Sequence, residues 1–556
     1  LDTASVSAII PNNPDFLRGI RMREFAKFFL LAAVVAVASS SAVALAQDEG
    51  APEAAAPAVS QSTSAFDLVL GEGKRLSRQG RYYDAALVYH KVLAEGDEAY
   101  AYYQDALFEM GVALNEQKFY VSAFGYFDRI AEFGPSSPHY AAALPWLAKI
   151  HRQLPGETNT LFRMAYYPVE MYPADLVEEI SFYVGQFYYY EGNLPKALES
   201  LSKVGESNPE MFNKALYLKG VVQVRQNNTD AAAETFSKLL GRFKGKLSKE
   251  SERLQIMTRI ALARVYYGGG QHDPAKFHEA IKNYGMIPDT SDMWLDSLFE
   301  RAWAFYQTEN YERALGNLLT VGSPYFEEEY YPEANVLKAV IFFRNCLYEE
   351  ALETIDPFYK EYYEISKELR IVLETYTDPS DFYTYLASIS RQGKGEGYSL
   401  KIKKIFNAAL ADAKLRRLFG FAIAISEEMK RIEELQNQPV ARPMVDYLLP
   451  DLVAYRALTM GEAGKLARER LSRVNRELRG LLQQALAVRF ETVNAQKGIL
   501  TERFRQEQII EISGAQKPTA EFQVDKEHVL WPFDGEYWKD ELGSYFYPLK
   551  SVCGTK

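Results

Sequence analysis

One pattern of small and aromatic residues returns six times along this chain, in a fixed order. Residues 181–209 show it clearly, because Gly185 and Gly192 are followed there by Ala197 and Leu201. Successive copies lie 35 to 38 residues apart, or about twice that across two weaker segments. The other copies contain Gly73, Tyr82, Ala85 and Tyr89; Gly111, Tyr120, Ala123 and Phe127; Gly220, Asn227, Ala232 and Phe236; Ala302, Tyr311, Ala314 and Leu318; and Ala339, Tyr348, Ala351 and Ile355. A unit this short cannot bury its apolar face alone, so the copies must stack into one continuous core.

The pattern resembles the tetratricopeptide repeat, a helix–turn–helix unit of about 34 residues. The Gly or Ala of the first helix and the Ala of the second are expected where the two helices cross, and a Gly or Asn supplies the turn. The repeated tyrosines at 82, 120, 311 and 348 are expected to pack in the core. The resemblance implies an all-α solenoid whose concave surface binds peptides or helices of other proteins.

The repeat superhelix is expected over residues 65–365, with six clear units and two degenerate ones at about 138–172 and 250–288. Connecting helices are expected at 366–397. The stretch "RQGKGEG" (391–397) ends them, since it breaks the helical pattern.

Residues 22–46 have the layout of a secretory signal peptide: a short basic region, an apolar run from Phe28 to Ala38 and an Ala44-Leu45-Ala46 cleavage pattern. Residues 1–21 are then expected to be an untranslated upstream extension. The alternative is an uncleaved inner-membrane anchor, because Phe28–Ala46 carries no charge. Both interpretations place the body of the protein in the periplasm. Residues 47–64 are rich in Ala, Pro and Ser, which predicts a flexible linker.

Residues 398–512 differ from the repeats in charge and are expected to form a basic helical hairpin. Residues 394–510 contain 21 Lys or Arg against 14 Asp or Glu, whereas the whole chain has a formal charge of −11. Two long helices are expected at about 399–437 and 451–511, joined by a loop with three prolines. Apolar residues in the second helix alternate by three and four and predict a coiled-coil seam. They are Leu471, Val474, Leu478, Leu481, Ala485, Val488 and Thr492.

A basic helix can bind anionic lipid or nucleic acid, but the arginines between 468 and 479 surround much of this helix. We therefore expect a solvated helix face, and no nucleic-acid binding.

The segment 513–556 is an irregular tail with an aromatic, acidic stretch, "WPFDGEYWKDELGSYFYP". Seven of these eighteen residues are aromatic, and their formal charge is −3. The tail is expected to fold back on the basic hairpin and cover its apolar seam. The alternative is a docking motif for a partner, because Trp and Tyr dominate binding hot spots. Its candidate protein-binding residues are Trp531, Phe533, Tyr537, Trp538 and Tyr545.

The sequence contains no recognisable catalytic, cofactor-binding or metal-binding motif. The stretch "LGEGKRLS" lacks the Ser or Thr that follows the lysine of a phosphate loop. The six histidines do not have metal-ligand spacing. Two cysteines are too few for a disulfide framework, and Cys346, in an inter-helix turn, is expected to be an inert thiol.

These observations favour a periplasmic scaffold or adaptor that is not an enzyme and needs no cofactor. Its expected partners are proteins of a bacterial cell-envelope assembly, in outer-membrane biogenesis, secretion or motility. One alternative is a peripheral envelope-membrane binder that uses the basic hairpin. A cell-wall-acting enzyme with a superhelical platform is a second alternative, and it would need a compact catalytic domain that residues 394–556 do not supply.

Overall fold

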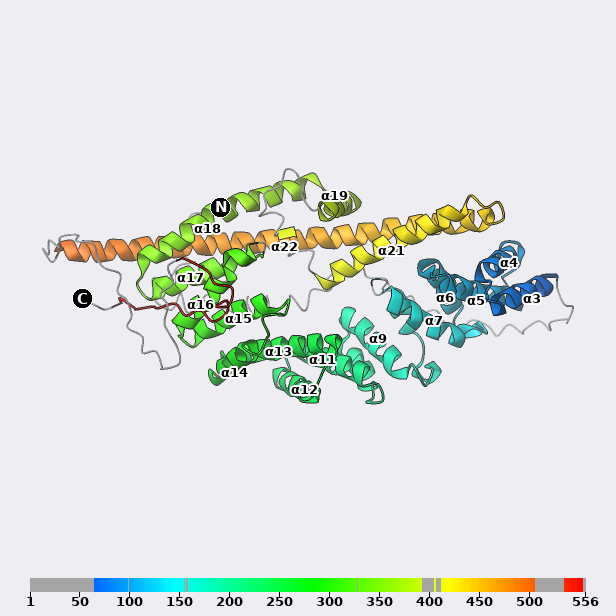
Figure 1. Ribbon diagram of the computed structural model, residues 1–556, viewed down its shortest axis with the longest axis horizontal. Coiled ribbons are helices and arrows are strands. Elements are labelled where there is room, and N and C mark those ends of the chain that lie inside the picture. The colour runs from blue at the N-terminus through cyan, green and yellow to red at the C-terminus, as the bar shows by residue number, and fades with distance from the viewer. Residues whose placement is uncertain are drawn as a thin grey trace, which may run out of the picture. The chain divides into compact units, whose positions relative to one another are not determined.

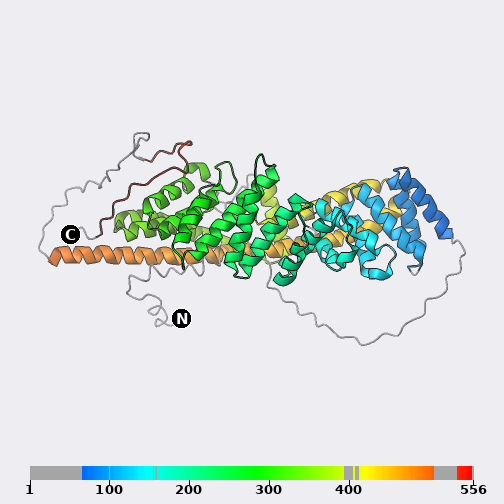
Figure 2. The same cartoon turned by 90° about the horizontal axis from the view of Figure 1, so that it is seen from below.

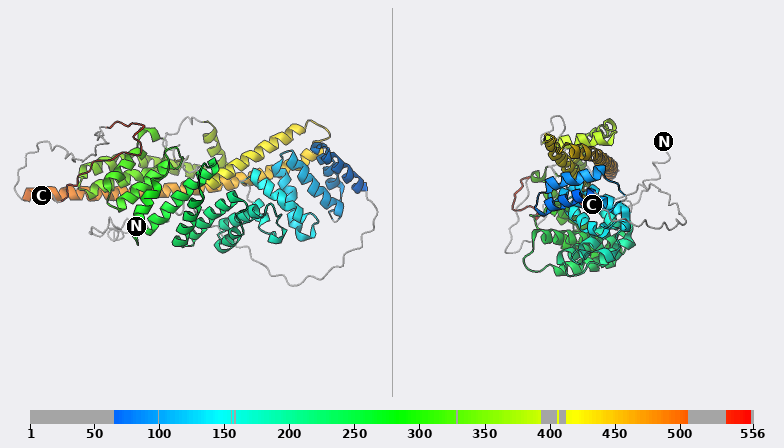
Figure 3. Two further views of the ribbon diagram at one scale, coloured as in Figure 1. Left: turned by 60° about the horizontal axis from the view of Figure 1, so that its bottom comes forward. Right: turned by 90° about the vertical axis from the view of Figure 1, so that its right-hand side faces the viewer.

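The computed structural model describes residues 65–98, 100–154, 156, 159–327, 329–392, 405–406, 412–505 and 535–553. Every regular element in this described part is a helix, and Figures 1, 2 and 3 show its helices from four sides. The prediction of an all-α repeat fold followed by long helices and an irregular tail is confirmed. The expected upstream extension, signal peptide and linker lie outside the described residues.

Each of the six predicted repeats is a pair of antiparallel helices. The pairs are α3 (Ala65–Arg78) with α4 (Tyr82–Glu95), α5 (Ala101–Glu116) with α6 (Tyr120–Phe133), α9 (Val177–Tyr190) with α10 (Leu194–Ser202), α11 (Pro209–Arg225) with α12 (Thr229–Arg242), α15 (Trp294–Gln307) with α16 (Tyr311–Val321), and α17 (Pro332–Arg344) with α18 (Tyr348–Thr375). The two degenerate segments are helical as well. They form α7 (Tyr140–Gln153) with α8 (Asn159–Met164), and α13 (Lys249–Gly269) with α14 (Ala275–Tyr284).

Small residues stand at the helix crossings, as the repeat pattern predicts. A Cβ added to Gly73 would lie 2.4 Å from the Tyr89 ring, and one added to Gly220 would lie 2.5 Å from Phe236. The repeated alanine of the second helix is fully buried in all six repeats. The repeated tyrosines are only half-buried, because each is the first residue of its second helix.

The turn between the two helices has a left-handed residue in every clear repeat. Gly80 and Gly192 take this conformation with φ of 74° and 77°, and Asn227 with φ of 60°. The same position is held by Lys118, Glu309 and Cys346, with φ of 63°, 58° and 59°. A left-handed conformation costs a residue with a Cβ roughly 1–2 kcal/mol. The turn geometry therefore belongs to the repeat and is imposed even where Gly or Asn is absent.

The described residues belong to two compact units. The first is residues 181–293, which contain α10 to α14 and most of α9. The second combines the repeats before residue 181 with everything from Trp294 onward.

Two long helices, α21 (Ala413–Leu435) and α22 (Arg442–Arg505), follow the repeats and pack against each other. The loop between them is shorter than predicted, and α22 begins nine residues earlier. Proline is compatible with the first helical turn, where Pro443 stands, because those N–H groups have no partner within the helix. Pro450 lies inside the helix and removes one backbone hydrogen bond from its 64 residues.

The buried seam of α22 differs from the predicted one in residues and in partner. Five of the seven predicted residues are buried as expected: Leu471, Leu478, Ala485, Val488 and Thr492. Asn475 and Leu482 replace Val474 and Leu481. This part of α22 packs on α18, where Asn475 Oδ1 accepts a hydrogen bond from Ser366 Oγ at 2.8 Å. At about 1.5 Å per residue, the 23 residues of α21 cover only part of α22, and other helices pack on further parts of it. These are α17, α18 and α19 (Pro379–Gln392).

Candidate protein-binding surfaces

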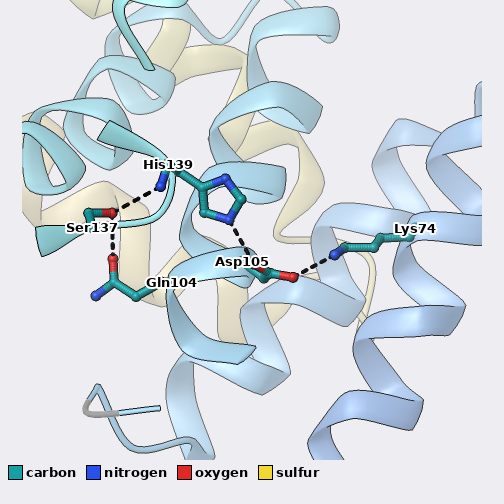
Figure 4. A network of polar contacts seen from close by, with 5 residues as sticks. All are labelled: Lys74, Gln104, Asp105, Ser137 and His139. Atoms are coloured by element: carbon teal, nitrogen blue, oxygen red, sulfur yellow. Dashed lines mark hydrogen bonds and ion pairs between the residues drawn. The ribbon is translucent and has the colours of Figure 1, made fainter. Parts of the chain in front are cut away.

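Neighbouring repeats are joined by a row of polar side chains from their first helices (Figure 4). Asp105 of α5 accepts from Lys74 Nζ of α3 at 2.6 Å and lies 2.7 Å from His139 Nε2, which precedes α7. Beside them, Ser137 Oγ donates to Gln104 Oε1 at 3.1 Å. The hydrogen bond with His139 and the Lys74 ammonium lower the pKa of Asp105 to about 2. Asp105 therefore stays ionised and holds three successive repeats in register.

Other ion pairs in the same unit have the same repeat spacing. Lys149 binds Glu116 at 2.8 Å, and Arg163 binds Glu132 at 2.6 Å and also Asp128. In the unit of residues 181–293, Arg242 binds Glu206 at 3.1 Å. Exposed pairs of this kind contribute only about 0–1 kcal/mol each. They help to align neighbouring repeats.

The long helices are fastened to α6 by a buried carboxylate. Glu428 of α21 is 3% exposed and accepts the backbone N–H groups of Val121 and Ser122 at 2.9 and 2.7 Å. It also accepts the Ser122 hydroxyl at 2.7 Å. These N–H groups are in the first turn of α6, where the helix itself supplies no acceptor. Burial nevertheless raises the pKa of Glu428 above its ordinary value, because desolvation outweighs the hydrogen bonds.

The basic face of α22 is not simply solvated, which corrects the expectation for two of its arginines. Arg468 donates to the carbonyl oxygens of Leu373, at 3.1 Å, and Tyr376. Arg470 forms an ion pair with Asp412 in which both side chains are mostly buried. The excess of positive charge here is partly used to join α22 to helices of its own chain.

The described part of the tail packs on the repeat of α15 and α16 and on α17, not on the basic hairpin (Figure 1). Gly543 N donates to Thr320 Oγ1 at 2.8 Å, and Tyr547 N donates to the Glu312 carbonyl at 3.2 Å. Farther on, Val552 N donates to the Asn345 carbonyl at 3.1 Å. The tail therefore folds back as expected, but the prediction that it contacts the basic hairpin is wrong for the described part of the tail. The physical reason is that α22 already buries its seam against α18.

The tail lies very close to α16 because a glycine faces it. A Cβ added to Gly316 would lie 1.8 Å from the carbonyl oxygen of Tyr545. Gly543 has a φ of 86°, and a Cβ there would lie 2.6 Å from the Trp294 ring. The close approach therefore requires glycine at both positions, Gly316 on the helix and Gly543 on the tail. Tyr547 packs edge-on against Phe342 with 5.7 Å between ring centroids, and Leu549 is buried.

The two cysteines are joined, contrary to the expected inert thiol. Cys346, in the turn between α17 and α18, forms a disulfide with Cys553, and their Cα atoms are 5.2 Å apart. This bond closes the far end of the tail onto the repeats. The left-handed turn and the tail meet only in the folded chain, so their separation of 207 residues concealed the pairing.

The five candidate residues of the tail have different surroundings. Trp531 and Phe533 lie outside the described residues. Tyr545 packs against Tyr537 with ring centroids 6.0 Å apart, and its hydroxyl accepts the Trp538 backbone N–H at 2.9 Å. The Trp538 side chain itself is 55% exposed. Of the three described residues, only Trp538 presents most of its side chain to solvent, and the protein-binding role of the five remains a prediction.

A signal for the tail-binding surface was present in the repeat register. Two positions after the repeated alanine, α10, α12 and α18 carry Glu199, Glu234 and Glu353, whereas α4 has Leu87, α6 has Gly125 and α16 has Gly316. Six positions after it, Lys203 and Lys238 correspond to Thr320. Loss of charge at two outward positions of one helix indicates that this face is covered.

In the described part of the chain, no group of His, Cys, Asp and Glu side chains is arranged to hold a metal ion. No described helix combines the length and the apolar character that crossing a membrane requires.

Two segments of the chain, residues 70–138 and 185–246, match the family model of the tetratricopeptide repeat. No curated protein matches this sequence. The similar solved structures include the apo form of RapI, which is 15% identical; the alignment covers 63% of this chain and 99% of that chain, with a TM-score of 0.33. Another is a tetratricopeptide repeat protein from Parabacteroides merdae, 14% identical over 53% of this chain and 91% of that chain, with a TM-score of 0.23.

A third, PilF of Pseudomonas aeruginosa, is 16% identical over 48% of this chain and 96% of that chain, with a TM-score of 0.22. At these scores the solved structures carry no argument about partners or activity. The left-handed turns, the crossings with small residues and the match to the family model agree with one another. The helix pairs of residues 70–138 and 185–246 match the tetratricopeptide repeat, and the described repeats form an all-α solenoid.

Proposed function

We propose that this chain is an exported scaffold that binds other proteins of a bacterial cell-envelope assembly. A stack of tetratricopeptide repeats is suited to protein–protein interaction, because it exposes long surfaces on a rigid frame. Outer-membrane biogenesis, secretion and motility remain the candidate processes. The repeats supply the interaction surfaces, and the exposed Trp538 of the tail is a further candidate contact.

The observation that carries the export part of the proposal is the pairing of the two cysteines. Disulfides persist in oxidising compartments such as the bacterial periplasm and are rare in the reducing cytosol. The Cys346–Cys553 bond agrees with the signal-peptide layout of residues 22–46, although the two observations are independent.

Expression in a bacterial host with and without residues 22–46 tests the location. The longer form is expected in the periplasmic fraction with both thiols protected from alkylation, and the shorter form in the cytosol with both thiols reactive. Recovery of the longer form in the cytosol would contradict export. Its recovery in the inner membrane would favour the uncleaved anchor.

Affinity purification from gently solubilised envelopes tests the scaffold role, with the full chain compared to a chain that ends at Ala520. Loss of a partner from the still-folded shorter chain would assign the contact to the tail, and retention would assign it to the repeats. Absence of any specific partner from either form would contradict the scaffold role.

The membrane-binding alternative is weakened by the arginines of α22 that bind their own chain. Flotation with anionic vesicles tests it, because salt-sensitive flotation of the full chain would favour an electrostatic attachment. The cell-wall enzyme alternative is tested by zymography on cell-wall material, where any clearing band would favour it.

A further inference from the structure

The outer face of α16 is the most thoroughly covered surface of any second helix in the clear repeats. Eight consecutive residues, from Ala314 to Val321, are buried. In α12, by comparison, only Ala232, Phe236 and Leu239 are buried. The tail contributes to this burial, because its residues 543–549 lie along α16, antiparallel to it: Gly543 at Thr320, Tyr545 at Gly316 and Tyr547 at Glu312.

The hydrogen bonds between α16 and the tail do not depend on tail side chains. Thr320 Oγ1 accepts one backbone N–H and the Glu312 carbonyl accepts another, four residues along the tail. The side-chain requirements are few: a glycine that fits against Trp294, an aromatic ring that meets Phe342, and an apolar residue at Leu549 that is buried. Backbone recognition with a few shaped contacts is how proteins bind extended peptides.

We propose that this face, formed by Trp294, Glu312, Gly316, Thr320 and Phe342, is a peptide-binding site and that residues 543–549 are its resident ligand. Its ligand class is an extended segment of the form Gly-x-x-x-aromatic-x-apolar. The Cys346–Cys553 disulfide lies just beyond the ligand segment and keeps it in the site.

The inference deepens the scaffold function and rests on it, because a scaffold gives such a site a use. A partner that carries a segment of this class binds where the tail is displaced. The site is centred on the second helix α16, and the first helices α15 and α17 contribute Trp294 and Phe342 to it.

The test is binding of a fluorescent peptide with the sequence of residues 536–552 to the full chain, followed by anisotropy. The host carries Gly543→Leu and Cys553→Ser, which push its own tail away from Trp294 and remove the disulfide. We expect saturable binding to this host and none to the oxidised wild-type chain, where the site is filled. Failure of the folded host to bind the peptide would overturn the proposal.

Two variants added to the same host locate the site. Gly316→Glu introduces the residue found at this position in α10, α12 and α18. It should weaken peptide binding roughly tenfold or more, because its side chain would occupy the space of the Tyr545 carbonyl. Gly125→Glu is the matched control: it occupies the equivalent position of α6, where an added Cβ meets nothing within 4 Å, and should leave binding unchanged.

A change in the peptide alone keeps the test valid if Gly316→Glu does not fold. A peptide with leucine in place of Gly543 should bind the host at least about tenfold more weakly, for the same steric reason. Equal binding of the two peptides would overturn the proposal. Failure to find envelope partners would not change this peptide-binding result, so failure of the scaffold role and failure of the peptide site can be distinguished.

Discussion

The second helices α12 and α16 share one repeat pattern, but only α16 is covered by the tail. Both begin three residues before a buried alanine, and both pack on the first helix of their repeat. The outward positions of α12 carry the exposed charges Glu234 and Lys238, whereas α16 has Gly316 and Thr320 under the tail. The core positions thus determine how the two helices of a repeat pack. The two outward residues determine whether the tail can cover the second helix.

The largest effect is expected from removing the disulfide that holds the tail against the repeats. Replacing Cys346 and Cys553 with serine opens a loop of 207 residues, which the chain-entropy model values at about 5 kcal/mol. Hydrogen exchange should show faster opening of α15 to α17, and α12 should be unaffected. Equal loss of protection in α12 would mean that the disulfide stabilises both units.

The buried seam of α22, which packs on α18, is the second contact to be tested, and Leu478→Ala tests it. Leu478 is fully buried, so truncation should cost about 2–5 kcal/mol. Thermal and urea denaturation measure this directly, with the exposed Leu486, which is 43% accessible, as the control for a leucine-to-alanine change on the same helix. An unchanged melting temperature in Leu478→Ala would show that this seam is no core.

Coverage by α22 also buries a carboxylate that an open repeat would leave in water. Desolvation, and secondarily the charge of Glu477 on α22, raise the pKa of Glu333 on α17 to about 8. The native state then holds a proton that the unfolded chain loses above its ordinary pKa of 4.5. The stabilisation is complete below that value and is lost as pH rises to about 8, by at most about 1.4 kcal/mol per pH unit. Glu333→Gln should flatten the melting temperature between pH 5 and 8; an unaltered slope would assign it to other groups.

Exchanging the outward residues of α12 and α16 tests directly whether these residues cause the difference between the two helices. Gly316→Glu should cost about 1–3 kcal/mol through overpacking and should remove the protection of the Gly543 and Tyr547 amides. The reverse change, Glu234→Gly, should cost only about 1 kcal/mol, the usual penalty of a helical glycine. Amide exchange by NMR distinguishes the two, because retained protection in Gly316→Glu would show that the tail does not need the glycine.

The smallest effect concerns the feature that the two units share, the left-handed turn. Glu309→Gly removes a strained conformation and should stabilise by at most about 1 kcal/mol, since glycine also adds freedom to the unfolded chain. Gly192→Glu makes the opposite change in the other unit and should destabilise. Melting temperatures that move in the same direction would contradict a common turn.

The repeats were predictable from sequence because their determinants are local. Gly185, Ala197 and Leu201 lie within one unit, and their spacing alone specifies a helix pair with a close crossing. The hairpin was predictable as two long helices, and five of the seven predicted seam residues are buried, but the partner of the seam was not predictable. Asn475 is polar and was left out of the predicted seam, yet it is buried because Ser366, 109 residues away, supplies its partner.

The candidate site was predictable only in part. An aromatic tail that folds back followed from its composition, whereas the surface it contacts depends on which faces the rest of the chain leaves open. The pairing of Cys346 with Cys553 has the same origin, since nothing local marks either residue as a disulfide partner.

By itself, the sequence determined the repeat, its all-α stack and its turns, because a core of short period is encoded in residues close together in the chain. Only the tertiary structure decided that Glu428 holds α6, that α22 packs on α18 and that the tail fills the face of α16. These contacts join distant residues: Ser366 and Asn475 are 109 positions apart, and Ser122 and Glu428 are 306 apart. Their energies depend on which surfaces remain uncovered once the repeats have stacked, and that is a property of the whole folded chain.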